Sequence, residues 1–358
     1  MERFGLVGLP NAGKSSLFNA LTGGDAPVAA HPYSTTETNI GVASVPDARI
    51  DALAEMSRSK KVIHASAEIV DIAGLQKGSS HGEGLGNRFL GGLREVDAIC
   101  YVLRAFRDDN VPGEADPLDD LTTLELELVL ADAASAETQL EKRRKAAKTD
   151  KTLGAELDAL QRAVGHLQGA TPLYRAGLTA EDRALLQPYF LLTAKPVIAV
   201  VNLGEDGLDD ADAIVERVSG QLGGVAEVLG LCVQLEAEAS RLDPAERTEL
   251  LEGLGLGEGA LPRLVRSAYH LLGLRTFLTT GDKESRAWTF RAGAKAPECA
   301  GVIHSDLQRG FIRAEVIRLD ELLQIGSWSK AKELGKLRVE GKDYEVVDGD
   351  VLEIRFNV

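Results

Sequence analysis

The stretch that decides the fold is Gly8-Leu9-Pro10-Asn11-Ala12-Gly13-Lys14-Ser15, near the start of a chain of 358 residues. It matches the phosphate-binding loop G-x-x-x-x-G-K-[ST]. An apolar segment typical of a strand, Phe4–Val7, precedes it, and an apolar-faced segment typical of a helix follows it. The glycines let backbone N–H groups approach phosphate oxygens, and the helix dipole favours bound anions. The pattern therefore predicts a nucleotide site.

Residue type assigns roles within this loop. We expect Lys14 to reach the β- and γ-phosphates and to act in catalysis, and we expect the hydroxyl of Ser15 to ligate Mg²⁺. The rest of the loop and the first residues of the helix are predicted to bind the nucleotide: Asn11, Ala12, Gly13 and Ser16.

A second motif supplies a sensor for the γ-phosphate. Residues 68–74 resemble a strand that ends in D-x-x-G. In nucleotide switches the aspartate, here Asp71, holds Mg²⁺ through a water, and the glycine N–H, here Gly74, bonds the γ-phosphate. Between the two motifs, residues 31–37 are the hydroxyl-rich loop in the right place to reach the metal. We predict Thr35 as that ligand, with Thr36 as the alternative.

The residues expected to bind the base follow an apolar strand at 196–202. Guanine-specific switches end this strand with N-K-x-D, whose carboxylate pairs with the guanine edge. Here the strand ends in Asn202-Leu203-Gly204-Glu205, so the lysine is missing and the carboxylate is one methylene longer. We predict that Asn202, Leu203 and Glu205 bind a base, with the guanine clamp altered at two of its three informative positions.

The chain alternates strand-like and helix-like segments at first and then changes character. The expected strands are Phe4–Val7, Ala67–Asp71 and Ala98–Leu103, which predict a mainly parallel sheet covered by helices. From Leu121 to about Gln168 the chain is rich in Ala, Leu and charged residues. Its apolar residues step by 4 and 3 from Leu153 to Leu167, as in a coiled-coil seam. A helical hairpin that reverses at 149–154 is expected.

The apolar pattern of a sheet resumes after the hairpin. We expect a strand at Leu229–Leu235 and a helix at Leu261–Leu272, followed by a small β-rich domain with short strands at 311–317, 336–339 and 351–356. The predicted domains are 1–120 with 190–274 for nucleotide binding, 121–189 for an inserted helical arm, and 275–358 for the C-terminal domain.

Composition narrows the class of protein. The net charge is −15, but residues 275–358 are neutral overall, so the acidic excess lies upstream. One dense basic segment interrupts that acidic region, at the expected tip of the hairpin: Lys142, Arg143, Arg144, Lys145, Lys148 and Lys151. It is either a solvated helix face or a contact for a phosphate backbone.

The sequence also indicates the compartment. Three widely spaced cysteines suggest neither a disulfide framework nor a zinc site. Nothing resembles a secretory leader or a membrane span, so we expect a soluble, cytoplasmic protein with no membrane partner.

Together the motifs resemble the YchF-type, Obg-like ATPases among the P-loop NTPases, essentially from end to end. The resemblance implies an α/β P-loop NTPase G domain with an inserted antiparallel helical coiled-coil arm, and a C-terminal TGS-like domain of β-grasp type. It implies preference for ATP over GTP, slow Mg²⁺-dependent hydrolysis, and association with ribosomes or ribosomal RNA. We expect a monomer without DNA sequence specificity. The residues that carry the resemblance are 8–16, 71–75, 82–87, 116–120, 202–205, 301–306, 310–315 and 341–344.

The chain departs from that family pattern at two positions. Ser34 stands where members usually have a cysteine, so a thiol-based redox response is not carried over. Tyr101 stands where many have a histidine, which puts any catalytic role proposed for that histidine in doubt.

The sequence does not identify which group positions the attacking water. Leu75 occupies the place where Ras-like switches have a glutamine, and it has no polar atom to orient water. His81 is one candidate, although a lone switch histidine is often simply solvent-exposed. K⁺ is another, because in related switches an Asn at the position of Asn11 ligates K⁺ beside the phosphates; Asn11 could equally stabilise the turn.

Three functions remain open at this point. The first is an ATPase switch that controls docking on the ribosome. The second is a GTPase of the same fold. The third is a nucleotide-stabilised ribosome-binding scaffold with negligible hydrolysis. A metabolic P-loop kinase is disfavoured, since no acceptor-binding signature is present.

Overall fold

The computed structural model describes residues 2–24, 38–72, 85–108, 111, 113–254 and 256–357, with only the backbone described at 85–88 and 244. The chain divides into two compact units. Unit 1 contains Met1–Val42 and Glu68–Leu264, and unit 2 contains Ala43–Ala67 and Val265–Val358.

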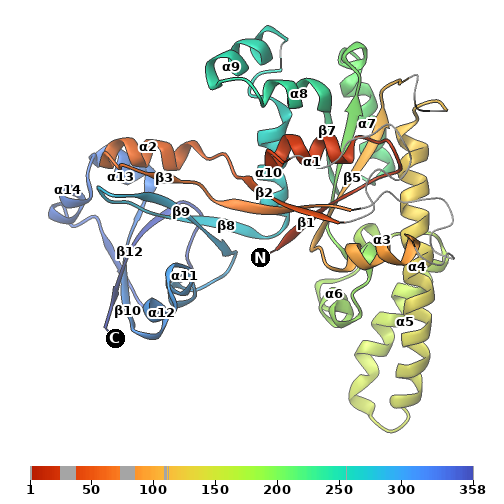
Figure 1. Ribbon diagram of the computed structural model, residues 1–358. Coiled ribbons are helices and arrows are strands. Elements are labelled where there is room, and N and C mark those ends of the chain that lie inside the picture. The colour runs from red at the N-terminus through yellow and green to blue at the C-terminus, as the bar shows by residue number, and fades with distance from the viewer. Residues whose placement is uncertain are drawn as a thin grey trace. The chain divides into compact units, whose positions relative to one another are not determined.

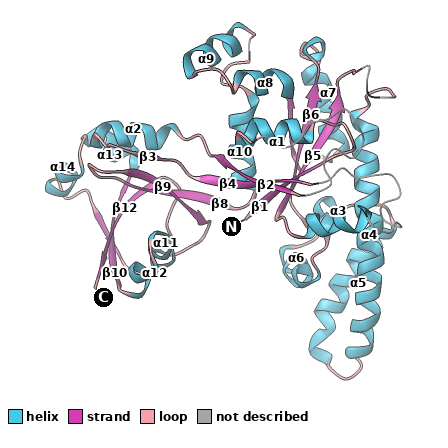
Figure 2. Cartoon of the chain, in the orientation of Figure 1, coloured by secondary structure: helices cyan, strands magenta, loops and turns pink. Residues whose placement is uncertain are grey.

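Unit 1 is built on a six-stranded sheet with the order β2-β4-β1-β5-β6-β7 (Figure 2). β1 pairs in parallel with β4 and β5, and β6 pairs in parallel with β5 and β7. Because the carboxyl ends of parallel strands meet at one edge, the segments that follow β1, β4 and β6 gather there. The strands are β1 (Arg3–Val7), β2 (Asn39–Ser44), β4 (Ser66–Asp71), β5 (Ala98–Ala105), β6 (Val197–Leu203) and β7 (Glu227–Leu231).

Helices cover this sheet and enclose its apolar core. Strand residues Val7, Ile99 and Val201 are fully buried in that core, beneath leucines from the helices. The helices are α1 (Lys14–Thr22), α3 (Leu85–Arg94), α7 (Ala211–Gln221), α8 (Val233–Ala239) and α9 (Pro244–Gly253), followed by α10 (Ala260–Leu271), which continues into unit 2.

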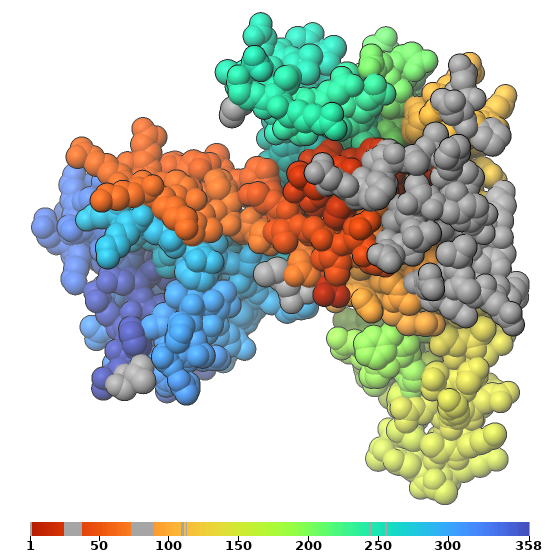
Figure 3. Space-filling model, viewed as in Figure 1, coloured from red at the N-terminus to blue at the C-terminus, as the bar shows by residue number. Residues whose placement is uncertain are grey.

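The inserted arm is an antiparallel pair of helices, α4 (Pro117–Ala146) and α5 (Gly154–Gln168), joined by η2 (Lys151–Leu153). The Asp116 carboxylate accepts hydrogen bonds from the Leu118 and Asp119 N–H groups, and Pro117 has no N–H to satisfy, so the first turn of α4 is well capped. Ala136 and Leu140 pack against Leu160 and other buried residues of α5. The structure therefore has the expected hairpin, and Figure 3 shows it in yellow projecting from the rest of unit 1.

Short helices return the chain from the arm to the sheet. They are η3 (Leu173–Arg175), α6 (Ala180–Leu186), η4 (Gln187–Tyr189) and η5 (Leu192–Ala194). Asp132 of α4 is buried and accepts hydrogen bonds from the backbone N–H groups of Leu192 and Thr193 at 2.9 and 2.7 Å. Glu125 of α4 accepts from the Tyr174 hydroxyl and, at 2.6 Å, from Arg175 Nη2. These buried carboxylates fix the root of the arm.

Unit 2 is a second six-stranded sheet, with the order β11-β10-β12-β8-β9-β3. Its strands are β3 (Val62–Ile63), β8 (Leu274–Thr279), β9 (Ser285–Arg291), β10 (Phe311–Arg318), β11 (Arg338–Glu340) and β12 (Asp350–Phe356). Phe277, Phe290 and Val316 form its core with residues of α11 (Ala296–Ile303). The other helices are α2 (Ala48–Ser57), α12 (Ser305–Arg309), α13 (Leu319–Ile325) and α14 (Trp328–Glu333).

Residues 43–67, which the sequence analysis placed inside the nucleotide domain, lie in unit 2. β3 pairs in parallel with β9, and Arg49 Nη1 of α2 is 2.7 Å from Asp348 Oδ2. Arg49 is also bound by Asp47 at 2.8 Å, and the two carboxylates raise the pKa of its guanidinium. β3 is far from β9 in the sequence, and Arg49 is far from Asp348, so no local sequence pattern could reveal these two pairings.

One predicted element is partly wrong. The strand expected at Leu229–Leu235 ends at Leu231, and the apolar residues from Val233 onwards form α8. The expected helix at Leu261–Leu272 corresponds to α10 within one residue at each end. Within the described ranges, no helix combines the length and apolarity that a bilayer crossing requires.

Candidate nucleotide-binding site

The phosphate-binding loop joins β1 to α1 and requires glycine at two places. A Cβ on Gly8 would lie 2.5 Å from the Val102 carbonyl oxygen, and one on Gly13 would lie 2.3 Å from Asn202 Nδ2. Gly13 also has a φ of +93°, which side chains disfavour, and Asn11 has a φ of +63°. The loop is thus wound tightly against its neighbours.

Asn202 holds this loop in place. Its Nδ2 donates to the Ala12 carbonyl oxygen at 3.0 Å, and its Oδ1 accepts from the Val233 N–H at the start of α8 at 3.2 Å. The side chain is 4% exposed. Asn202 therefore links the end of β6, the loop and α8, and it acts on the nucleotide site by positioning Ala12. A direct contact between Asn202 and the base stays a prediction.

Lys14 is enclosed by the loop. Its side chain is buried, and Nζ donates to the Leu9 carbonyl oxygen at 2.9 Å. Burial lowers the pKa of the ammonium to about 8, although the negative charges of Asp71 and Asp120 act in the opposite direction. The cation is thus held against the loop backbone at Leu9, where bound phosphate oxygens would offset its charge.

Ser15 and Asp71 meet where α1 begins and β4 ends, at the same edge of the sheet. The Ser15 hydroxyl donates to Asp71 Oδ2 at 2.7 Å. Asp71 is fully buried, and burial raises the pKa of its carboxyl, opposed by the Ser15 hydrogen bond and by Lys14. Among the described residues, no group hydrogen-bonds Asp71 Oδ1, which is also buried. Mg²⁺ prefers oxygen ligands, and this site offers a hydroxyl next to a carboxylate whose second oxygen has no hydrogen-bond partner among the described residues. These residues therefore fit that ion.

Several predicted residues lie outside the described residues: Thr35 and its alternative Thr36, Gly74 and His81. Ser34 and Leu75 lie outside them too. Their roles remain predictions from the sequence. Of the remaining loop residues, Ala12 is buried and Ser16 lies in the first turn of α1.

The residues predicted to bind the base lie just beyond Asn202. The Leu203 side chain is 1% exposed and belongs to the core, so this residue can offer a base only its backbone groups. Glu205 begins the short helix η6 (Glu205–Gly207) and is exposed. The carboxylate of Glu205 is therefore free of the packing that restrains Leu203.

Asp120 is a residue of the site that the sequence analysis did not assign. Its Oδ2 accepts from the N–H of Arg104, a residue near the end of β5 that pairs with Asn202 of β6, at 3.1 Å. Burial raises the pKa of Asp120, and its charge acts on Lys14. The signal was present, since Asp120 belongs to the segment 116–120 that contributed to the family resemblance.

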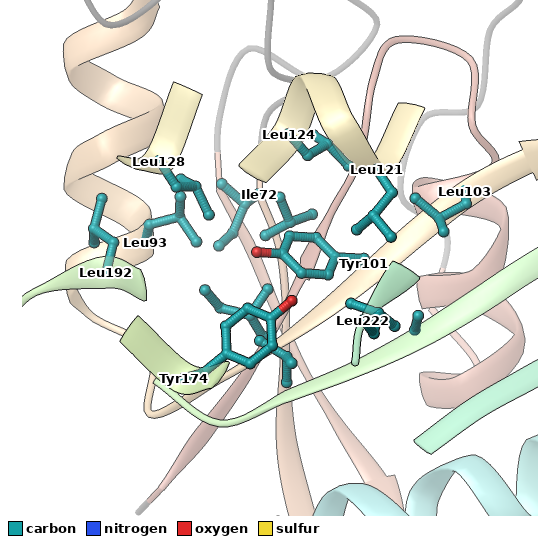
Figure 4. Close-up of a cluster of buried hydrophobic side chains, with 14 of the residues drawn as sticks. Ile72, Leu93, Tyr101, Leu103, Leu121, Leu124, Leu128, Tyr174, Leu192 and Leu222 are labelled. Atoms are coloured by element: carbon teal, nitrogen blue, oxygen red, sulfur yellow. The ribbon is translucent and has the colours of Figure 1, made fainter. Parts of the chain in front are cut away.

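The Tyr101 side chain lies in the core beneath α4, although its backbone pairs with Val7 just before the loop. Figure 4 shows its ring between Leu121, Leu124 and Leu222, near Tyr174. The side chain is 1% exposed, and burial raises the pKa of its hydroxyl. A neutral phenol packed among leucines has a structural role, which agrees with the doubt about catalysis at this position.

Comparisons with known proteins agree with this geometry. The family model described as a 50S ribosome-binding GTPase matches residues 3–135, and the C-terminal model for YchF-type GTPases, described as a protein of unknown function, matches residues 274–357. The ribosome-binding ATPase YchF of Bacillus subtilis is 45% identical to the chain, and the match covers 99% of each protein. The chain belongs to the YchF family. The YchF protein of Haemophilus influenzae, also named a ribosome-binding ATPase, is likewise 45% identical over 99% of each chain.

Solved structures extend the comparison. The YchF GTPase of Schizosaccharomyces pombe superposes with a TM-score of 0.86 at 32% identity, covering 99% of this chain and 97% of that one. A GTP-binding protein of Pyrococcus horikoshii shares the fold, with a TM-score of 0.62 at 20% identity. The YchF resemblance and the predicted fold class are thus confirmed: an α/β P-loop NTPase domain and a separate C-terminal sheet domain.

Proposed function

We propose that this YchF family member is a Mg²⁺-dependent switch that binds and hydrolyses ATP and whose nucleotide state controls association with ribosomes in the cytoplasm. The observation that carries the proposal is the meeting of Lys14, Ser15 and the partly unsatisfied Asp71 at one sheet edge, beside a base motif altered from the guanine clamp. The names of the curated relatives support ATP and the ribosome as partners.

The residues of the phosphate site have different proposed roles. Loop N–H groups and Lys14 hold the phosphate oxygens, and Lys14 offsets negative charge that develops during transfer. Ser15 would ligate Mg²⁺ directly and Asp71 through a water, with Thr35 as a further ligand. The metal, when bound, neutralises charge on the β- and γ-phosphates. We propose that the Gly74 N–H contacts the γ-phosphate.

Hydrolysis is expected to be slow without a further group. Leu75 has no polar atom to orient the attacking water, so we assign that task to His81 or to a K⁺ ligated by Asn11. The same leucine favours the second candidate function, a nucleotide-stabilised scaffold that binds ribosomes and scarcely hydrolyses ATP.

Adenine preference follows from the end of β6. Leu203 presents only backbone groups, and Glu205 has a longer reach than the aspartate of the guanine clamp. We propose that these groups read the adenine edge. The solved YchF structure from S. pombe is described as a GTPase, so a GTPase of the same fold remains the alternative to test.

The arm offers the surface for a ribonucleoprotein. Lys142, Arg144 and Lys145 are exposed at the end of α4. Arg143, by contrast, donates from Nε to the Tyr189 hydroxyl at 2.8 Å and lies 3.3 Å from Glu156, so it serves the arm itself. We therefore assign phosphate contacts to the three exposed cations and to Lys148 and Lys151 of the connecting turn.

The C-terminal domain offers a second basic cluster, in and after α14. Lys330 and Lys332 are exposed. Lys336 pairs with Glu321 at 3.2 Å, and Arg338 donates to the Tyr344 hydroxyl at 3.0 Å. We therefore assign the contact to Lys330 and Lys332.

Co-sedimentation with ribosomes tests the proposal, in ADP and in a non-hydrolysable ATP analogue. A switch binds ribosomes better in one nucleotide state, because a partner with equal affinity for both states shifts nothing. Equal sedimentation in both states would contradict the switch. Single-turnover hydrolysis with and without ribosomes then separates an activated ATPase from the scaffold, which shows no acceleration.

A further inference from the structure

A basic surface lies at the β3 edge of the sheet in unit 2, which we call the β3–β9 edge. It joins the end of α2 and the turn that follows, residues 57–61, to the turn before β9, residues 280–284 (Figure 1). The Lys60 N–H donates to the Asp282 carbonyl oxygen at 3.2 Å, and the Ser285 N–H donates to the Lys61 carbonyl oxygen at 2.9 Å. Two segments far apart in the sequence thus form one surface.

Cations dominate this surface. Arg58, Lys60, Lys61 and Lys283 are exposed, and the Arg286 side chain is 38% exposed. The acidic side chains in the same two segments are Asp282 and Glu284, and Glu284 lies 3.9 Å from Arg286. The surface is therefore positive in a chain whose net charge is −15. Such a local reversal of charge attracts a polyanion.

Arg286 gives the surface a flat group as well as a charge. Its Cζ lies 4.0 Å from the centre of the Trp288 ring. That ring is stacked on buried Phe277, with centroids 6.4 Å apart and 13° between the planes, and its Nε1 donates to Thr279 Oγ1 at 2.9 Å. The guanidinium is thus the outer layer of a fixed stack. A planar guanidinium held in this way suits stacking on an unpaired nucleobase.

The pleat of the sheet places the charge of Lys61 on the same face as the stacked side chains of Arg286 and Trp288. β3 pairs with β9 so that Ile63 lies opposite Arg286. Side chains alternate along an extended segment, so Lys61 shares a face with Ile63, and Arg286 shares it with Trp288. A strand of nucleic acid that stacks a base on Arg286 therefore meets Lys61 next.

A cluster of hydroxyl groups fixes the two turns. Ser59 Oγ lies 2.7 Å from Ser285 Oγ and donates to the Gly281 carbonyl oxygen at 2.8 Å. Thr280 Oγ1 lies 2.6 Å from Ser285 Oγ and donates to Ser57 Oγ at 2.7 Å. Ser285 is fully buried. The cations are thus presented by ordered turns, which lowers the entropy cost of binding.

We propose that the β3–β9 edge binds single-stranded RNA, with an unpaired base stacked on Arg286 and the phosphodiester backbone held by Lys61, while Lys60 and Lys283 add positive charge from the same turns. The stack distinguishes RNA from an acidic peptide, which would use the lysines alone. The proposal rests on the proposed ribosome association for its biological partner. Its test uses neither nucleotide nor ribosomes, so the two can fail separately.

Trp288 provides the readout in the full-length chain. The chain has two tryptophans, so Trp328→Phe leaves Trp288 as the single reporter. We expect a short oligouridylate to change Trp288 fluorescence on binding. In that background Arg286→Ala should weaken binding at least about fivefold, the low end of the range for one stacked base. Arg286→Lys keeps the charge but loses the plane, and should weaken binding nearly as much.

Charge reversal gives the matched comparison. Lys61→Glu should weaken RNA binding and reduce its salt dependence by about one unit of slope. Lys342→Glu makes the same change at an exposed site of unit 2 outside the surface, and should bind RNA like the parent.

Four results would overturn the proposal: no binding of the oligonucleotide, binding without a change in Trp288 fluorescence, equal losses at Lys61 and Lys342, or equal affinity for polyglutamate.

Discussion

Asn202 Nδ2 donates to the Ala12 carbonyl oxygen at 3.0 Å, and through this bond the end of the β6 strand fixes the phosphate-binding loop. The other amide atom of Asn202 accepts from the start of α8. One buried side chain thus couples the part of the site near the base to the part that holds the phosphates.

Asn202→Asp should separate these two bonds. The aspartate keeps an acceptor for the Val233 N–H but loses the donor to Ala12, and places a carboxylate against a carbonyl oxygen. We expect nucleotide affinity to fall by about 1–3 kcal/mol, the usual cost of a broken buried hydrogen bond. Calorimetry measures the affinity, and thermal unfolding of the nucleotide-free protein provides the control. Unchanged ATP affinity would show that the loop needs no support from β6.

Lys14→Ala should abolish measurable ATP binding, because the variant removes the one side-chain cation that the loop encloses. Ser15→Ala should weaken binding only when Mg²⁺ is present, since it removes a metal ligand and the hydrogen bond to Asp71. Calorimetry with and without Mg²⁺ distinguishes the two variants, and circular dichroism checks their fold. ATP affinity like that of the unmodified chain in Lys14→Ala would remove the basis of the proposed function.

The cysteines should be inert in the native protein. Burial raises the pKa of Cys299 to about 12 and also raises the pKa of Cys100 and of Cys232. At pH 8 a thiol with a pKa of 12 has a thiolate fraction of about 10⁻⁴, so alkylation by iodoacetamide should be slow until the chain unfolds. Mass spectrometry measures the labelling. Rapid native labelling would contradict the burial.

ATP should bind at least about tenfold better than GTP, a difference of about 1.4 kcal/mol, as expected when one good base hydrogen-bonding pair is lost. Glu205→Asp combined with Leu203→Lys tests whether guanine binding can be restored. Because the Leu203 side chain is buried, the double variant needs thermal unfolding as a control, and Glu205→Asp alone is the safer first step. Competition against labelled ATP decides the matter: equal displacement by GTP supports the GTPase alternative.

The sequence predicted the parts of the site that depend on neighbouring residues. The loop at residues 8–15 is contiguous, and its glycines are required by contacts of 2.3 and 2.5 Å that any Cβ would make. The meeting of Ser15 and Asp71 was also foreseeable, since parallel strands end at a common edge.

The parts that depend on distant contacts were not predicted. β3 has two residues, and its pairing with β9, together with the ion pair of Arg49 with Asp348, ties residues 43–67 to unit 2. The apolar run at Leu229–Leu235 resembles one strand, but Asn202 Oδ1 accepts the Val233 N–H and so satisfies a donor at the start of a helix instead. The negative charge of Asp120 acts on Lys14 although the two residues are far apart in the sequence, so only the family resemblance of segment 116–120 pointed to it.

The last prediction concerns ribosome binding by the helical arm, and the structure reduces the basic segment at the end of α4 to three exposed cations that test it. Neutralising Lys142, Arg144 and Lys145 to glutamine should weaken ribosome binding, because each is exposed and each lost phosphate contact reduces the salt slope by about one. ATP affinity should stay unchanged, since none of these three residues belongs to the nucleotide-binding site.

Arg143→Gln is the matched control at the same end of α4. It should lower the stability of the arm by loosening Tyr189 and Glu156, and should leave ribosome binding nearly as it is. Sedimentation over a range of salt concentrations measures both variants. Ribosome binding that survives loss of all three exposed cations, with the arm folded, would place the docking surface elsewhere and leave Lys330 and Lys332 as the next residues to neutralise.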